Sequence, residues 1–208
     1  MSGPADTRAR ILDVARELFA TQGIESTTMR AIAAGVGTSA PAIYHHFADK
    51  DALLRELMVT DLRRLGASFA RAMRVPDPVD RIREIGMTYV RFGLDHPQHY
   101  RVLFMTPNAK SAALEAEVAR DLEATPEMDA YHLVVQAVTA AIEAGRFGPD
   151  YQDPERVAQI CWGMAHGLVA LDIVFSKQTW IEWRDPLISA ERSIRAMLRG
   201  MQEGAPNR

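Results

Sequence analysis

The sequence contains one cysteine, no long uninterrupted apolar run and no excess of basic residues. Because Cys161 stands alone, an intramolecular disulfide and a zinc site built from several cysteines are excluded, which fits a reducing compartment. The most apolar stretch, residues 161–175, is interrupted by His166 and Asp172 and is too short to cross a membrane. The first ten residues have no apolar core, so no signal peptide is expected. We therefore expect a soluble, cytoplasmic protein without a membrane partner.

The charge balance gives little support for a nucleic-acid partner. Arginine and lysine total 24 against 27 aspartate and glutamate residues, so the net charge is −3. Within residues 1–50 the basic side chains are matched by acidic ones; the two sets are Arg8, Arg10, Arg16, Arg30 and Lys50, and Asp6, Asp13, Glu17, Glu25 and Asp49. Domains that bind nucleic acid are usually basic. If this chain binds it, the placement of individual groups must carry the interaction.

Helical periodicity dominates the sequence, and no run alternates as a half-buried strand does. The pattern predicts an all-α chain of about nine helices, with 48% hydrophobic residues available for a core. Glycine, proline and capping residues bound the segments that are long enough for helices. These are 7–22, a stretch ending near Val36 and another ending near Phe47, followed by 49–75, 78–95, 98–105, 110–123, 127–145, 154–176 and 186–201. No repeat or Gly/Ser linker separates them.

The N-terminal segments have the pattern of a helix-turn-helix, in which two short helices joined by a glycine turn are braced by a preceding helix. Thr27 or Thr28 can cap the second helix, and Gly37 suits a left-handed turn after it. Ser39 can cap the third helix, and Pro41 is tolerated in its first turn.

The third helix has a surface suited to a major groove. Ile43 and Phe47 are four residues apart and should face inward. The residues left facing outward are Ala40, Pro41, Tyr44, His45 and His46. Small residues permit close approach to bases, and the aromatic hydroxyl and the imidazoles can donate to phosphates. A more ordinary interpretation makes Tyr44 an aromatic cap on the core and the two histidines a solvated pair.

The stretch RILDVARELFATQGIESTTMRAIAAGVGTSAPAIYHHFADKDALL (10–54) resembles the DNA-binding domain of the TetR/AcrR family of bacterial repressors. The matching features are AxxLFxxxG in the first helix, Thr-Thr and Ile-Ala in the second, Gly37, Ile-Tyr-His-His-Phe, and Asp-Lys-Asp-Ala-Leu-Leu. Thr38 and Gly35 depart from the family pattern at the turn, but neither removes a DNA contact.

The resemblance implies a DNA-binding domain over residues 1–54 and a helical ligand-binding and dimerisation domain over 55–208. It makes Thr28, Tyr44, His46 and Lys50 contacts to the phosphate backbone, and Arg30, Ala40, Pro41 and His45 the base-facing set. With Ser39 at the start of the third helix, the expected DNA-binding residues are Thr28, Arg30, Ser39, Ala40, Pro41, Tyr44, His45, His46 and Lys50.

The segment 154–176 carries apolar residues on nearly all its faces, which indicates burial on two sides. One side would meet the core of the subunit, and the other could meet a second subunit. In the family the last two helices of each chain form a four-helix dimer interface, and the residues expected there are Cys161, Met164, Leu168, Leu171, Phe175, Ile194, Met197 and Leu198.

WGMAHG (162–167) resembles the Trp-x-x-x-His-Gly pattern of one subgroup of TetR C-terminal domains, and HPQHYRVLF (96–104) resembles the element that precedes it there. One interpretation is an apolar ligand pocket with a few polar groups, lined by Tyr89, Phe92, Tyr100, Phe104, Met105, Tyr131, Trp162 and His166. A second makes His166 a core histidine bonded to a neighbouring helix, with Trp162 filling the core. A third is a metal site of His96, His99, His132 and His166, although no carboxylate motif accompanies them.

These features predict a regulator, most simply a repressor, that binds a palindromic operator as a homodimer and is released by a small, largely apolar ligand. The alternative is a dimeric DNA-binding protein whose C-terminal domain is a scaffold without an effector. No nucleophile elbow, phosphate loop or zinc-protease pattern is present, so we expect no enzymatic activity. We expect no cofactor and no metal.

Overall fold

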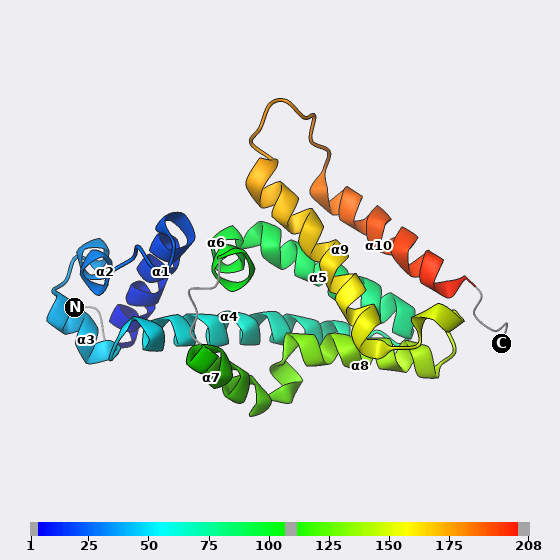
Figure 1. Cartoon of the computed structure of the whole chain (residues 1–208), viewed down its shortest axis with the longest axis horizontal. Helices are drawn as coiled ribbons and strands as arrows, with labels where there is room; N and C mark the ends of the chain where they lie inside the picture. The colour runs from blue at the N-terminus through cyan, green and yellow to red at the C-terminus, as the bar shows by residue number, and fades with distance from the viewer. Residues whose placement is uncertain (1–3, 107–111, 204–208) are drawn as a thin grey trace. The chain divides into compact units, whose positions relative to one another are not determined.

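The computed structural model describes residues 4–106 and 112–203, and over these residues it is helical without strands (Figure 1). The α-helices are α1 (Pro4–Gln22), α2 (Met29–Val36), α3 (Ala40–His46), α4 (Lys50–Ala72), α5 (Pro78–Asp95), α6 (Pro97–Tyr100), α7 (Ala112–Glu123), α8 (Ala130–Glu143), α9 (Pro154–Phe175) and α10 (Pro186–Gln202). Residues Arg101–Met105 form a π-helix, η1, and two 3₁₀ turns cover Pro126–Met128 and Pro149–Tyr151. The all-α prediction is confirmed.

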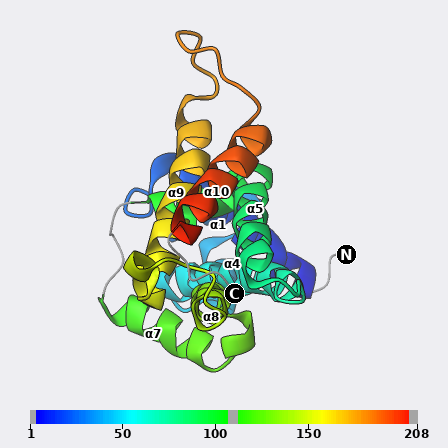
Figure 2. The same cartoon turned by 90° about the vertical axis from the view of Figure 1, so that its right-hand side faces the viewer.

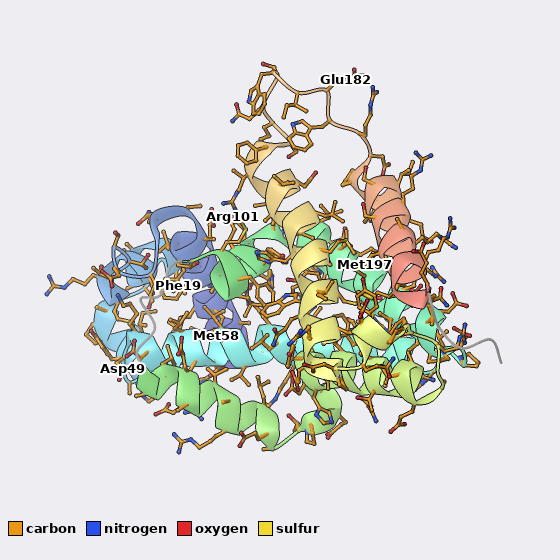
Figure 3. The ribbon with its side chains drawn as sticks, turned by 45° about the vertical axis from the view of Figure 1, so that its right-hand side comes forward. Phe19, Asp49, Met58, Arg101, Glu182 and Met197 are labelled. Carbon is orange, nitrogen blue, oxygen red and sulfur yellow. The ribbon has the colours of Figure 1, made fainter. Side chains whose placement is uncertain are left out.

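Local signals define the ends of the N-terminal helices. The Thr28 hydroxyl accepts a hydrogen bond from the backbone N–H of Ala31 at 3.1 Å, so Thr28 is the residue that caps α2. Gly37 ends α2 with φ 75°, a left-handed conformation that glycine adopts without steric cost. Asp49 caps α4 by accepting from the N–H of Ala52 at 2.7 Å, and it lies where α4 begins (Figure 3).

The chain divides into two compact units. Unit 1 comprises residues 1–62 and 98–124, and unit 2 comprises residues 63–97 and 125–208. This division differs from the expected boundary after residue 54, because α6, η1 and α7 pack with the N-terminal helices. Arg55 on α4 donates to both carboxylate oxygens of Asp121 on α7, at 2.8 and 3.0 Å.

A triad of a buried ion pair, Arg16 with Asp61, and the adjacent His99 joins three elements of unit 1. Arg16 on α1 donates to both carboxylate oxygens of Asp61 on α4, at 3.2 and 3.3 Å. His99 on α6 lies with its Nδ1 atom 2.8 Å from the same carboxylate. Both Arg16 and Asp61 are buried. Removing one partner of such a buried pair leaves an uncompensated charge, which typically costs about 3–5 kcal/mol.

The core of unit 1 forms where α1, α2 and α3 pack beside the first turns of α4. Its fully buried residues include Ile11 and Phe19 of α1, Ile43 of α3 and Leu57 of α4. Phe19 and the buried Met58 are labelled in Figure 3. The predicted inward orientation of Ile43 and Phe47 is confirmed, since both are buried.

Unit 2 is built around α5, which contacts α8, α9 and α10. Figures 1 and 2 both show α9 and α10 side by side, joined by a connection that extends beyond their ends. A Cβ atom at Gly86 of α5 would lie 3.0 Å from the Cδ1 atom of Ile194 on α10, so the glycine permits this close approach. The backbone N–H of Gly148 donates to the carbonyl of Met201 at 2.8 Å and fixes the end of α10.

The helix α9 is apolar but mostly uncovered. Among the described residues it alone is long and apolar enough to cross a membrane by length and composition, a test that core helices of soluble proteins also pass. Only Val157, Ala158, Ala165 and Val169 of this helix are buried. Unit 2 therefore leaves one apolar face of α9 without a covering element of its own.

Candidate functional sites

The exposed face of α2 and α3 carries most of the residues expected to meet DNA. Arg30 lies in the first turn of α2, and Pro41 and His45 are exposed on α3. Tyr44 is 53% exposed, so it does not serve as an aromatic cap on the core. Of the remaining members, Thr28 and Ser39 are exposed, whereas Ala40 and His46 are half-buried.

Two hydroxyl groups on this face also cap helices. Ser39 accepts from the N–H of Ala42 at 3.4 Å, as Thr28 does from Ala31. A hydroxyl that accepts a bond through its oxygen keeps its hydrogen for donation. Thr28 and Ser39 can therefore cap their helices and donate to a phosphate at the same time.

Four of the five basic side chains in residues 4–50 are engaged within the chain. Arg10 donates to the carbonyl of Val36 at 2.9 Å, and Arg16 belongs to the triad with Asp61. Lys50, expected at a phosphate, directs its ammonium to the carbonyls of the loop before α2. Arg30 alone among these five has no hydrogen bond or ion pair to the described residues.

Arg8 is engaged with the end of α3, and the sequence analysis did not single it out. Its Nη1 atom donates to the carbonyl of His46 at 2.8 Å, and its guanidinium lies 4.3 Å from the centroid of the Phe47 ring. The remaining nitrogens bind both carboxylate oxygens of Glu56 on α4. One side chain of α1 thus ties the last turn of α3 to α4.

In unit 2, three side chains that were expected in a ligand pocket form a hydrogen-bonded chain. The indole Nε1–H of Trp162 on α9 donates to the Tyr89 hydroxyl on α5 at 2.9 Å. The same hydroxyl lies 3.4 Å from Nδ1 of His166, one turn further along α9. Tyr89 is buried while Trp162 is 42% exposed, so the tryptophan does not fill the core. The bond from His166 to α5 agrees with the interpretation of a histidine bonded to a neighbouring helix.

Tyr131 of α8 extends this cluster at the surface of unit 2. Its ring centroid lies 6.2 Å from that of Trp162, and its hydroxyl donates to Glu155 at 2.6 Å. That carboxylate raises the pKa of Tyr131. Of the other expected pocket residues, Phe92 lies on α5 and contacts His96. Tyr100, Phe104 and Met105 belong to unit 1, where the first two rings lie 5.0 Å apart.

The residues expected at a dimer interface separate into two groups. Ile194 and Leu198 are buried within unit 2, so they pack inside the single chain. The exposed or half-buried members are Cys161, Met164, Leu168, Leu171, Phe175 and Met197. Burial raises the pKa of Cys161 to about 12, so its thiol stays protonated and unreactive at neutral pH.

No metal site is apparent in residues 4–106 and 112–203, where no three histidine, cysteine or acidic side chains gather. Instead, His99 lies against Asp61, and His166 lies against Tyr89. The interpretation of four histidines as a metal site finds no support in these positions.

A short exposed helix behind a glycine turn, braced by α1 and α4, defines a DNA-binding protein of the helix-turn-helix class. A family model for bacterial regulatory proteins of the tetR family matches residues 11–57, and one for the tetracyclin repressor-like C-terminal domain matches residues 82–201. The chain belongs to the TetR family and is a transcriptional regulator, not an enzyme. The finer resemblance of residues 162–167 to one subgroup stays a prediction.

The relatives support this assignment over most of the chain. The regulator UidR of Escherichia coli K12 is 28% identical over 166 residues, covering 79% of this chain and 80% of UidR. A tetR-family regulatory protein of Rhodococcus RHA1 has a structure similar to this one, with TM-score 0.77, 25% identity and coverage of 99% and 100%. The structure of AibR with isovaleryl coenzyme A and operator DNA has TM-score 0.72 at 18% identity, covering 95% of this chain and 99% of AibR.

The environment of His166 predicts a pH dependence of stability. Burial lowers the pKa of His166 below its ordinary value of 6.5. The unfolded chain therefore binds more protons than the folded one between the two pKa values, so stability falls as pH drops through that window. Thermal unfolding should show a smaller loss of Tm between pH 7.5 and pH 5 for His166→Asn than for the native protein. An equal loss of Tm in the two proteins would contradict the lowered pKa of His166.

Proposed function

We propose that this regulator is a repressor that binds a palindromic operator as a homodimer and releases it when a small, largely apolar ligand binds unit 2. The observation that carries the DNA-binding half is the surface of α2 and α3, which combines one unpaired cation, Arg30, with exposed polar side chains and small residues. AibR, whose structure contains operator DNA, has the same fold. The proposal also requires the protein to act in the compartment that holds the genome.

Base recognition is proposed to rest on Arg30. A guanidinium can bind O6 and N7 of guanine with two hydrogen bonds. The small side chains of Ala40 and Pro41 would let the start of α3 approach thymine methyl groups. Tyr44, His45, His46, Thr28 and Ser39 would donate to bases or phosphates around it.

Replacing Arg30 tests this proposal. A duplex is first selected from a random DNA pool by the native protein, and its base pairs are then varied one at a time. Arg30→Met should lose about 1–3 kcal/mol of discrimination at one base pair in each half-site. Arg71→Met, a change at an exposed arginine of α4 in unit 2, should leave the preference intact. A native preference pattern in Arg30→Met would refute the role, and failure of the native protein to select any duplex would refute DNA binding.

The homodimer is proposed to form through the uncovered faces of α9 and α10. On α9 the exposed Ile160, Leu171 and Val174 follow one face together with Gly163 and Gly167. A Cβ atom at either glycine would meet nothing within 4 Å in the single chain. An apolar helix face with glycines open to approach suits close packing against a second helix.

Gly167→Arg should separate the subunits without unfolding them. The new side chain has open space in the monomer and a better helix propensity than glycine. In the dimer it would place a charge in an apolar contact. Light scattering should report a dimer for the native protein and a monomer for Gly167→Arg, with unchanged helical circular dichroism. Gln136→Arg, at an exposed position of α8, should remain dimeric. Persistence of the dimer in Gly167→Arg would contradict this interface.

The ligand site is proposed around Tyr89, Trp162 and His166. Three polar groups at 2.9 and 3.4 Å among aromatic rings match the composition of small-molecule sites, in which a few polar atoms orient an apolar ligand. A ligand can release DNA only if its affinity differs between the DNA-bound and free conformations. AibR was solved with isovaleryl coenzyme A, whose acyl part is small and apolar, so a first panel presents such acyl groups both as coenzyme A thioesters and as free acids.

A thermal-shift screen of acyl-coenzyme A thioesters and free apolar acids tests the site. A ligand at one hundred times its Kd should stabilise the native protein by about 2.7 kcal/mol. Tyr89→Phe removes the hydroxyl that links Trp162 to His166 and should weaken the binding of the same ligand. Tyr151→Phe, on the 3₁₀ turn before α9, serves as the matched control. A panel without any stabilising compound would favour the alternative, a dimeric DNA-binding protein whose C-terminal unit is a scaffold.

A further inference from the structure

The loop between α1 and α2 has few backbone hydrogen bonds of its own. It begins at Gly23, whose φ is 87° and whose N–H donates to the carbonyl of Phe19 at 3.1 Å. The buried hydroxyl of Thr27 donates to the carbonyl of Gly23 at 2.8 Å. The carbonyls of Ile24 and Thr27, two buried residues, need donors from elsewhere, because unpaired backbone groups away from water are costly.

Lys50 supplies these donors from the first residue of α4. Its Nζ atom lies 2.8 Å from the carbonyl oxygen of Ile24, 3.3 Å from that of Thr27 and 3.5 Å from that of Glu25. An ammonium group has three N–H donors and no acceptor. The bond to Ile24 has ordinary length, the bond to Thr27 is long and the contact with Glu25 is at the limit, and all three direct the donors of Lys50 into the loop.

The placement of this lysine at the start of a helix supports the same conclusion. A cation is disfavoured there because the helix N-terminus carries a partial positive charge. The three carbonyl oxygens offset that repulsion, since they bring partial negative charge to the ammonium. The side chain is half-buried, as the contacts require.

The loop ends where α2 begins, so its conformation sets the position of the first turn of α2. Thr28 caps that turn, and Arg30 is its second residue. We propose that Lys50 is a positioning residue for operator recognition: its ammonium holds residues 24–27 and thereby orients Arg30, instead of neutralising a phosphate. The proposal rests on the proposed DNA binding and revises the phosphate contact expected for Lys50.

Salt dependence distinguishes positioning from a phosphate contact. Each phosphate neutralised by a cation contributes about 0.9 to the slope of log affinity against log salt concentration. Lys50→Met should weaken binding of the selected duplex by about tenfold or more, because it leaves loop carbonyls without donors. The slope should stay that of the native dimer. A slope reduced by about 1.8, for two lost phosphate contacts per dimer, would overturn the proposal, as would unchanged affinity.

A double-mutant cycle tests whether Lys50 acts through Arg30. The Lys50→Met, Arg30→Met variant should bind within about threefold of Arg30→Met alone, because the residue that Lys50 positions is already absent. Multiplication of the two single losses would show that the residues act independently, against the proposal. Leu57→Ala, a buried change on α4, controls for general destabilisation and should combine multiplicatively with Arg30→Met.

Hydrogen exchange of the protein without DNA gives a measurement that does not depend on operator binding. Lys50→Met should accelerate exchange of the amides of Ala31 and Ile32, which donate to Thr28 at the start of α2, by about tenfold or more. Lys50→Arg, which retains several donors, should keep most of the native protection. Unchanged exchange in Lys50→Met would refute the positioning role. If the exchange result holds but no duplex binds even the native protein, the proposed DNA binding fails and the structural role of Lys50 stands.

Discussion

A helix of seven residues cannot hold its own conformation in water, because the cost of starting a helix is recovered only over a longer stretch. The third helix of this regulator, α3, has that length, and the proposed function requires it to present its side chains to DNA in a fixed direction. Its ends are therefore held from outside. Ser39 caps the start, while Arg8 donates to the carbonyl of His46 and lies over Phe47 at the end. The orientation of the whole DNA-facing surface depends on these contacts.

The use of basic side chains for contacts within the chain explains how a DNA-binding unit can lack an excess of basic residues. Arg8, Arg10, Arg16 and Lys50 direct their donors to carbonyl or carboxylate oxygens within the chain. These cations hold short helices and tight loops in place, including Arg10, which is itself exposed. In the proposed DNA complex, recognition would then come from well-placed contacts more than from a general attraction to phosphates. Two copies of the unit on one operator would compensate for the modest contribution of each.

The sequence predicted those features that depend on neighbouring residues. Gly37, Ser39 and the spacing of Ile43 and Phe47 are local signals, and the structure has the corresponding turn, cap and buried face. Local patterns could not predict the partners of Lys50, which lie 23 to 26 residues away in the chain. The local sequence around Lys50, a lysine directly after a capping residue, would be the same whether its ammonium contacted a phosphate or a backbone carbonyl.

The burial of Asp61 was also invisible to local patterns, because an acidic residue in an amphipathic helix is normally solvated. The partners that accompany its burial, Arg16 and His99, lie 45 and 38 residues away in the sequence. The exposure of α9 was only partly predictable. Its apolar residues on all faces indicated two burial environments, but the sequence alone could not tell that Ile194 and Leu198 of α10 pack inside the subunit.

The contacts of Asp61 also lie close to the points at which the chain leaves unit 1. The C-terminal family match begins at residue 82, yet residues 98–124 fold with the N-terminal helices in unit 1. The chain passes between the units after residues 62, 97 and 124. Asp61 and His99 each lie within two residues of one of these crossings, and their contact, with Arg16, links both crossings to α1. The ion pair of Asp61 with Arg16 is buried, so separating the two side chains carries a large cost. These contacts therefore hold α4 and α6 to α1 close to the points at which the chain leaves unit 1.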